Sequence, residues 1–155
     1  MKNKIVIAAF LALALLVPAV LAYISPLSTK EIALYEKNPA DWSIIEGGAH
    51  GVVIMETGTM RTLVWGLNPA TEYTLIYYGD ATHNDVWPYA TCIKTFRTSL
   101  MGYARSLSGK FSYSGFLSDQ TLQKFWVVKA SDVNCATGRM TAWHPTEYLF
   151  ESMTV

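Results

Sequence analysis

The densest group of polar side chains in the sequence lies at residues 80–85, which read Asp-Ala-Thr-His-Asn-Asp. Carboxylate and amide oxygens are the hard donors that Ca²⁺ prefers, so Asp80, Asn84 and Asp85 form a candidate calcium site. Their spacing does not match an EF-hand loop, and Asp and Asn also bond to their own backbone in ordinary turns. Turn chemistry is therefore the favoured interpretation, and the sequence predicts no metal or other cofactor.

Two aromatic residues, Trp87 and Tyr89, follow this polar run. Rings on a loop could stack on a sugar, while Asp80 and Asp85 supply hydrogen bonds. The alternative is that the rings close one end of a β domain, because large aromatic side chains are usually well buried. Residues 80–89 are thus a candidate loop for binding carbohydrate or another small ligand, and plugging of the domain end is the simpler interpretation.

Patterns for catalysis are weaker. The three histidines, His50, His83 and His144, are far apart and share no zinc-ligand spacing. The Gly-x-Ser-x-Gly motif of a nucleophilic serine is missing from the sequence. His144 and Glu147 could form a base with its orienting carboxylate, but the His-Pro-Thr-Glu run favours a turn. The sequence therefore favours a non-enzymatic protein, and a hydrolase with scattered site residues is a third hypothesis.

The N-terminus predicts export. Lys2 and Lys4 precede an uncharged apolar run at residues 5–24, and small residues up to Ala22 fit a signal-peptidase site. We expect residues 1–22 to be a signal peptide. The alternative is an uncleaved membrane anchor, since about 20 apolar residues can span a bilayer. Both interpretations place the domain outside the cytoplasm.

Cysteine usage and charge agree with that location. Cys92 and Cys135 are the two cysteines, and an even count in an exported chain predicts a disulfide, with two free thiols as the alternative. Removing residues 1–22 takes away two of the 12 basic residues, so 10 face 12 acidic ones and the net charge is about −2. That charge gives no reason to expect nucleic acid or an anionic membrane as a partner.

Short alternating runs of apolar and polar residues predict strands through most of the chain. Residues 23–41 are rich in turn chemistry and are expected to be an irregular segment, in which Ser28–Tyr35 could form a short helix. Expected strands then follow at residues 42–46, 50–56, 60–65, 72–78, 89–98, 102–113, 124–130, 139–143 and 146–151.

These strands define the expected fold. About eight short strands with frequent turn signals predict an antiparallel sandwich or barrel, and of the two we expect an immunoglobulin- or fibronectin-like β-sandwich after an N-terminal signal helix. The absence of long helical patterns argues against βαβ repeats. The expected organisation is a signal peptide at 1–22, an irregular segment at 23–41 and one β-sandwich domain at 42–155.

The last expected strand carries two carboxylates. Glu147 and Glu151 are an even number of residues apart, so both should lie on a solvated face, with Tyr148 and Phe150 facing inward. Paired carboxylates can hydrolyse glycosides, but only within a cleft, which the sequence does not show.

Two resemblances add to this reading. Gly66–Tyr73, Gly-Leu-Asn-Pro-Ala-Thr-Glu-Tyr, resembles the G-L-x-P-x-T-x-Y turn and strand of fibronectin type III domains. Trp143–Glu151, with Leu34–Pro39, Trp42 and the strand at 71–80, resembles an uncharacterised group of small secreted β-domain proteins of archaea, especially methanogens, and of bacteria. Members of that group end in W-x-P-T-E-Y-L-F-E. The resemblances imply a β-sandwich and an exported location, and they imply no activity.

The sequence therefore predicts a secreted or cell-envelope β-sandwich module with a structural or interaction role. Its partner would be a protein or a carbohydrate at the cell surface, and it would touch a membrane only if the N-terminal segment stayed uncleaved. The alternatives are a carbohydrate or small-ligand binder that uses residues 80–89, and a hydrolase.

Overall fold

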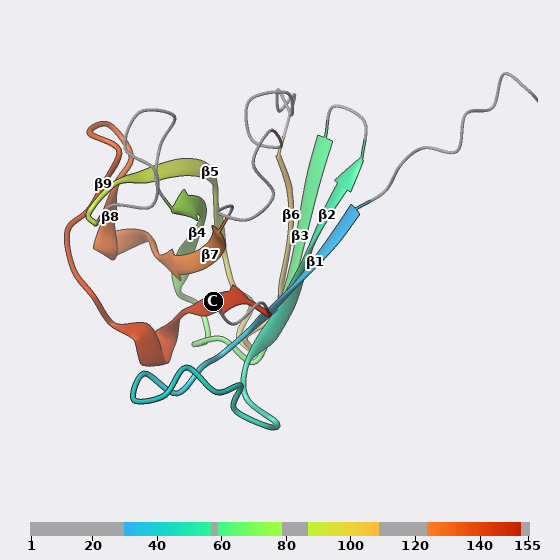
Figure 1. Ribbon diagram of the computed structural model, residues 1–155. Coiled ribbons are helices and arrows are strands. Elements are labelled where there is room, and N and C mark those ends of the chain that lie inside the picture. The colour runs from blue at the N-terminus through green and yellow to red at the C-terminus, as the bar shows by residue number, and fades with distance from the viewer. Residues whose placement is uncertain (1–29, 57–58, 79–86, 109–123, 153–155) are drawn as a thin grey trace, which may run out of the picture.

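The computed structural model describes residues 30–56, 59–78, 87–108 and 124–152 (Figure 1). Within them the only helical elements are two short 3-10 turns, Ala130–Asp132 and Pro145–Glu147, so the expected all-β class is confirmed. No helix in this described part is long and apolar enough to cross a membrane. The expected signal helix at residues 1–22 lies outside the described residues.

Eight strands form one antiparallel sheet in the order β5-β4-β7-β10-β1-β2-β3-β6. A separate two-stranded pair joins β8 to β9. The strand bounds are β1 Lys30–Tyr35, β2 His50–Glu56, β3 Thr59–Trp65, β4 Glu72–Tyr78, β5 Ala90–Arg97, β6 Ala104–Ser108, β7 Lys124–Lys129, β8 Val133–Asn134, β9 Arg139–Met140 and β10 Leu149–Glu151.

The large sheet is continuous and strongly curved. Its two edge strands, β5 and β6, lie near each other, so the sheet forms a nearly closed barrel (Figure 1). Antiparallel sheets twist, and the accumulated twist of eight strands brings the edges together. The antiparallel pairing agrees with the sequence analysis, whereas an immunoglobulin-like sandwich of two sheets is not confirmed.

Two expected elements are wrong. Lys30–Tyr35 forms β1 instead of part of a helix, and it lies in the sheet between β10 and β2. Its Lys-Glu-Ile-Ala-Leu-Tyr sequence contains good helix formers, but hydrogen bonding along two neighbouring strands outweighs that weak preference. Residues 42–46 form no strand, and only Ile44 makes an isolated bridge, to Lys37. The turn chemistry of Asn38 and Asp41 prevails there, since both side chains accept backbone N–H groups two residues further on.

The C-terminal strand also differs from expectation. Strand β10 lies between β7 and β1, and all three of its residues, Glu151 included, are buried. Glu147 belongs to the 3-10 turn before the strand, where it pairs with Lys129 at 2.6 Å. The expected solvated face with Glu147 and Glu151 side by side is therefore wrong, whereas Tyr148 and Phe150 are buried as expected.

Strands β4, β7 and β10 are covered on both faces. Alternate side chains of these strands enter two different apolar clusters. The cluster inside the barrel includes Tyr73, Leu75, Phe125, Val127 and Leu149. The cluster on the outer face includes Ile76, Tyr78, Trp126, Val128, Tyr148 and Phe150. The outer cluster needs a cover of its own, and β8, β9 and the segments around them provide part of it.

The predicted disulfide between Cys92 and Cys135 is confirmed, with Cα atoms 5.5 Å apart. It attaches the β8–β9 pair to β5. Backbone contacts support the same junction, because Ala90 N–H donates to the Gly138 carbonyl at 3.0 Å and Met140 N–H donates to the Pro88 carbonyl at 2.7 Å.

Replacing both cysteines by alanine should lower the free energy of unfolding by up to about 4 kcal/mol, because the bridge closes a loop of 43 residues in the unfolded chain. Urea unfolding of the wild type and of Cys92→Ala/Cys135→Ala measures the difference. Wild-type protein kept in reductant is the matched control and should unfold at the same urea concentration as the double variant. An equal midpoint for oxidised and reduced wild type would contradict the prediction.

Candidate ligand-binding site

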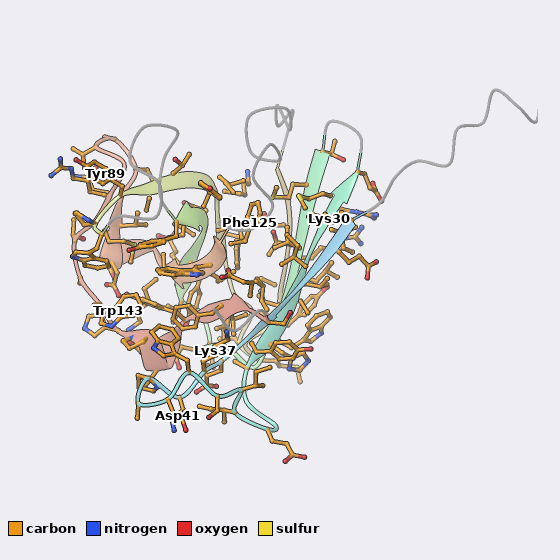
Figure 2. The ribbon with its side chains drawn as sticks, viewed as in Figure 1. Lys30, Lys37, Asp41, Tyr89, Phe125 and Trp143 are labelled. Carbon is orange, nitrogen blue, oxygen red and sulfur yellow. A yellow bond between two sulfur atoms is a disulfide. The ribbon has the colours of Figure 1, made fainter. Side chains whose placement is uncertain are left out.

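Three partly exposed tryptophans, Trp42, Trp87 and Trp143, gather on one flank of the domain, and we call them the tryptophan surface. Their exposed fractions are 42%, 47% and 39%. Trp143 is the centre, with its ring centroid 6.3 Å from that of Trp42 and 5.6 Å from that of Trp87. Figure 2 shows Trp143 on the flank that carries β8 and β9, opposite the β1–β2–β3 side. Segments far apart in the sequence thus build one exposed aromatic group.

A buried aromatic layer supports the tryptophan surface from below. The Trp143 ring lies 5.7 Å from Trp126, 5.6 Å from Tyr148 and 6.0 Å from Phe150. Trp126 in turn stacks on Tyr78 with centroids 4.1 Å apart. Because this layer is part of the outer cluster, the exposed rings rest on well-packed side chains and are held in place.

Trp42 has an unusual backbone conformation. Its φ is +60°, in the left-handed region that residues with a Cβ rarely adopt, at a cost of about 1–2 kcal/mol. The surrounding turn imposes it, since Trp42 N–H donates to the Asn38 carbonyl at 2.7 Å and Asn38 N–H donates to the Ser43 carbonyl at 2.9 Å. The ring then packs edge-on against Phe150 at 5.2 Å. The backbone is therefore strained at the residue whose ring packs against Phe150.

The candidate ligand residues from the sequence divide into three groups. Trp87 is exposed and belongs to the tryptophan surface. Tyr89 is half-buried, and Arg139 covers it, with the guanidinium 4.9 Å from the ring centroid and a hydrogen bond of 3.1 Å to the hydroxyl. Residues 80–86, which include Asp80, Asn84 and Asp85, lie outside the described residues.

A second polar arrangement, which we call the Asp132 site, adjoins Trp143. The buried Asp132 carboxylate accepts hydrogen bonds from the Ser131 hydroxyl and from His144 Nδ1, each at 2.7 Å, and a short one from the Tyr148 hydroxyl. His144 itself is half-exposed. The carboxylate that orients His144 is therefore Asp132, because Glu147 pairs with Lys129 instead.

The donors around Asp132 determine its charge state. Burial raises the pKa of this carboxyl, but the hydrogen bonds from Tyr148, His144 and Ser131 together outweigh burial and leave the pKa below its ordinary value. Burial and the bond to Asp132 raise the pKa of Tyr148. At neutral pH, Asp132 is therefore an anion and Tyr148 a neutral donor, which is the arrangement that satisfies a buried carboxylate.

A polar cavity of about 240 Å³ lies on the other side of Tyr148, between Glu36, Asn68, Tyr73 and Glu147. Its carboxylates already have partners. Glu36 accepts the Ala49 N–H at 2.9 Å, and Glu147 accepts the Asn68 amide at 2.8 Å besides pairing with Lys129. Neither carboxylate is thus held as a free acid or base.

The Asp132 site contains some of the parts of a catalytic site. A histidine oriented by a buried carboxylate is half of a nucleophilic triad. Within the described residues, however, no serine, threonine or cysteine side chain hydrogen-bonds to His144. In the same part of the chain, no three His, Cys, Asp or Glu side chains are placed to hold a metal ion. The described residues thus present a group of exposed rings and, on the residue that follows the central ring, an imidazole oriented by Asp132.

Replacing Asp132 by asparagine should lower the free energy of unfolding by about 1–3 kcal/mol at pH 7, because the buried donors lose a charged acceptor. The folded-state pKa of Asp132 is depressed, so its stabilising effect is complete above the unfolded value near 3.9 and is lost as pH falls through the folded pKa. The difference between wild type and Asp132→Asn should thus shrink below about pH 4. Urea unfolding at pH 7, 5 and 3 measures it, with Glu72→Gln, an exposed carboxylate, as the control. A difference that stays constant to pH 3 would contradict this account.

The free energy of unfolding of Trp42→Gly should be about 1 kcal/mol higher than that of Trp42→Ala. Both variants lose the ring, but only glycine adopts a φ of +60° freely. The same pair at Trp65, an exposed position in β3, is the matched control. There alanine should be the more stable variant, since glycine weakens a strand. Chemical denaturation of the four variants decides the order, and Trp42→Gly at or below Trp42→Ala would show that the turn stores no strain.

Comparison with known proteins gave no match to a protein-family model, to a curated protein sequence or to a solved structure. A function must therefore be inferred from the geometry of the tryptophan surface and of the Asp132 site.

Proposed function

We propose that the chain is an extracytoplasmic binding module that holds carbohydrate on the tryptophan surface. One observation carries the proposal: three partly exposed tryptophans, more than 40 residues apart in sequence, meet over a buried aromatic layer. Exposed clusters of large apolar side chains usually mark interaction sites, because a role in packing alone would be served better by burial. Tryptophan is also one of the residues that contribute most to the binding energy at interfaces.

The chemistry around the rings favours carbohydrate over other ligands. The rings meet at 44° and 81°, so ring faces and ring edges are presented together and no single flat plane forms. Sugars have apolar C–H faces for such rings and hydroxyl groups for a polar border. Exposed polar groups border the rings, namely His144 next to Trp143, and Asp41 and Ser43 on either side of Trp42. Without residues 1–22, whose removal is part of the proposal, the net charge is about −2, which gives no attraction for polyanions.

The extracytoplasmic location is part of the proposal. Lys2, Lys4 and the apolar run behind them support export. The disulfide supports an oxidising compartment, because such bonds persist mainly outside the cytoplasm. Carbohydrate polymers of cell surfaces are accessible there.

A relationship to fibronectin-like domains is a further part of the proposal. Its support is the turn before β4, where the buried Tyr73 hydroxyl accepts the Asn68 N–H at 3.2 Å. A tyrosine that anchors a corner in this way is a feature of immunoglobulin-like folds.

Removing a ring of the tryptophan surface should weaken carbohydrate binding about tenfold or more. The test uses the disulfide-bonded chain from residue 23 on an array of plant, fungal and microbial glycans, followed by calorimetry with the bound sugar. Trp143→Ala removes the central ring, and Trp87→Ala removes the most exposed of the three, whose loss should disturb folding least. Trp65→Ala is the matched control, because Trp65 is similarly exposed but packs with His50 and Tyr103.

Three results would overturn the proposal. The first is wild-type protein that binds no glycan on the array. The second is a glycan whose affinity falls as much in Trp65→Ala as in Trp87→Ala. The third is binding only to a protein partner, with all glycans inert, which would make the tryptophan surface a protein interface. Circular dichroism of each variant separates lost binding from lost folding.

A further inference from the structure

We propose that His144 is a specificity-determining contact of the tryptophan surface, that its Nε2 accepts a hydrogen bond from a sugar hydroxyl, and that Asp132 is the positioning residue that holds it. This proposal rests on the carbohydrate function proposed above and names the group that would distinguish one sugar from another. The juxtaposition of a buried carboxylate, a half-exposed imidazole and the central tryptophan carries it.

Of the two ring nitrogens of neutral His144, Nε2 is the one available to a ligand. His144 Nδ1 lies 2.7 Å from a carboxylate oxygen of Asp132. A carboxylate is only an acceptor, so Nδ1 carries the hydrogen, and in the neutral ring Nε2 has the lone pair. The Asp132 carboxylate is buried, whereas the His144 side chain is 54% exposed, so the ring extends from the buried carboxylate toward the surface. Nε2 is therefore an acceptor with a fixed direction.

His144 is anchored together with the central ring of the tryptophan surface. His144 follows Trp143 directly, and both are fixed to the same residue, Tyr148. The backbone N–H of His144 donates to the Tyr148 hydroxyl at 3.1 Å, and the Trp143 ring meets the Tyr148 ring edge-on at 5.6 Å. The Tyr148 hydroxyl donates in turn to Asp132. The backbone and the ring of His144 are thus held at two points, and the imidazole keeps one position relative to the central tryptophan.

A purely structural role explains the Asp132–His144 pair less well. Asp132 would still have donors in Ser131 and Tyr148 without the imidazole. Fixing a half-exposed side chain lowers its rotamer entropy and returns little stability, because exposed ion pairs are weak. A fixed polar group beside fixed rings does, however, suit recognition, since a ligand then meets an ordered surface. The rings would select a C–H face, and Nε2 would select a hydroxyl at one position of the sugar.

The test compares wild type with His144→Ala, Asp132→Asn, Trp87→Ala and the control His50→Gln, which alters a histidine on the opposite side of the barrel. The probes are cellohexaose, chitohexaose and mannohexaose, measured by calorimetry. His144→Ala should weaken the best-bound probe about fivefold, as expected for one hydrogen bond. Asp132→Asn should weaken it to a similar extent. The double variant His144→Ala/Asp132→Asn should bind the probe no more weakly than the weaker-binding of the two single variants, because the two residues act through one contact. His50→Gln should bind like wild type.

Imidazole ¹⁵N spectra of the wild type distinguish a ligand contact of His144 from a purely structural role, because only a ligand contact changes the Nε2 signal when the probe is added. In the free protein, at a pH at which the imidazole is neutral, the His144 signals should be those of the ring protonated at Nδ1. Addition of the bound probe should shift the Nε2 signal, and Asp132→Asn should change the tautomer signals before any probe is added. The His50 signals should stay unchanged throughout.

The outcomes separate this inference from the proposed function. Loss of binding in Trp87→Ala with wild-type affinity in both His144→Ala and Asp132→Asn would overturn the role of His144 and leave the tryptophan surface standing. A probe that binds without shifting the Nε2 signal would do the same. Wild-type affinity in Trp87→Ala would count against the tryptophan surface itself. A wild-type protein that binds none of the three probes and no glycan on the array would overturn both proposals.

Discussion

Burial of both faces of β4, β7 and β10 is the constraint on which the rest of the structure depends. One face closes the interior of the barrel, and the other presents large rings that also have to be shielded from water. The strands cannot supply that shield themselves. It comes from segments between strands, which place Trp42 and Trp143 against the outer cluster and Trp87 against Trp143. These rings stay partly exposed, so the need to cover a second core also accounts for the exposed aromatic group of the tryptophan surface.

Electrostatics imposes a related constraint nearby. A buried carboxylate is unfavourable unless several donors share it, and Asp132 meets this condition with side chains from two segments. Because two of those donors come from His144 and Tyr148, the segment before β10 is tied to the segment after β7. The charge thus fixes the backbone that carries Trp143. Packing and electrostatics act on the same few residues, and both limit the movement of the exposed rings.

Some of this arrangement could be predicted from the sequence. Strands β2, β3 and β4 have clear alternation and turn signals on both sides, and they lie within one residue of the expected bounds. The disulfide could be predicted because two cysteines allow one pairing. β1 could not, since its residues favour a helix in isolation and become a strand only through their neighbours. Trp87 is a candidate ligand residue from the sequence, but its grouping with Trp42 and Trp143 depends on how three connecting segments lie over the sheet. The pairing of Asp132 with His144 joins residues in separate turns, for which no periodic pattern exists.

The bridge between Cys92 and Cys135 affects more than the unfolding equilibrium. It attaches the β8–β9 pair to the strand that follows Trp87, while Asp132 lies just before β8 and Trp143 just after β9. Both sides of the exposed surface are therefore linked covalently, and their separation is set when the thiols are oxidised. A ligand bound there as proposed would meet a surface whose shape is already determined. We therefore expect association to resemble the docking of two rigid bodies, with little ordering of the protein at the moment of contact.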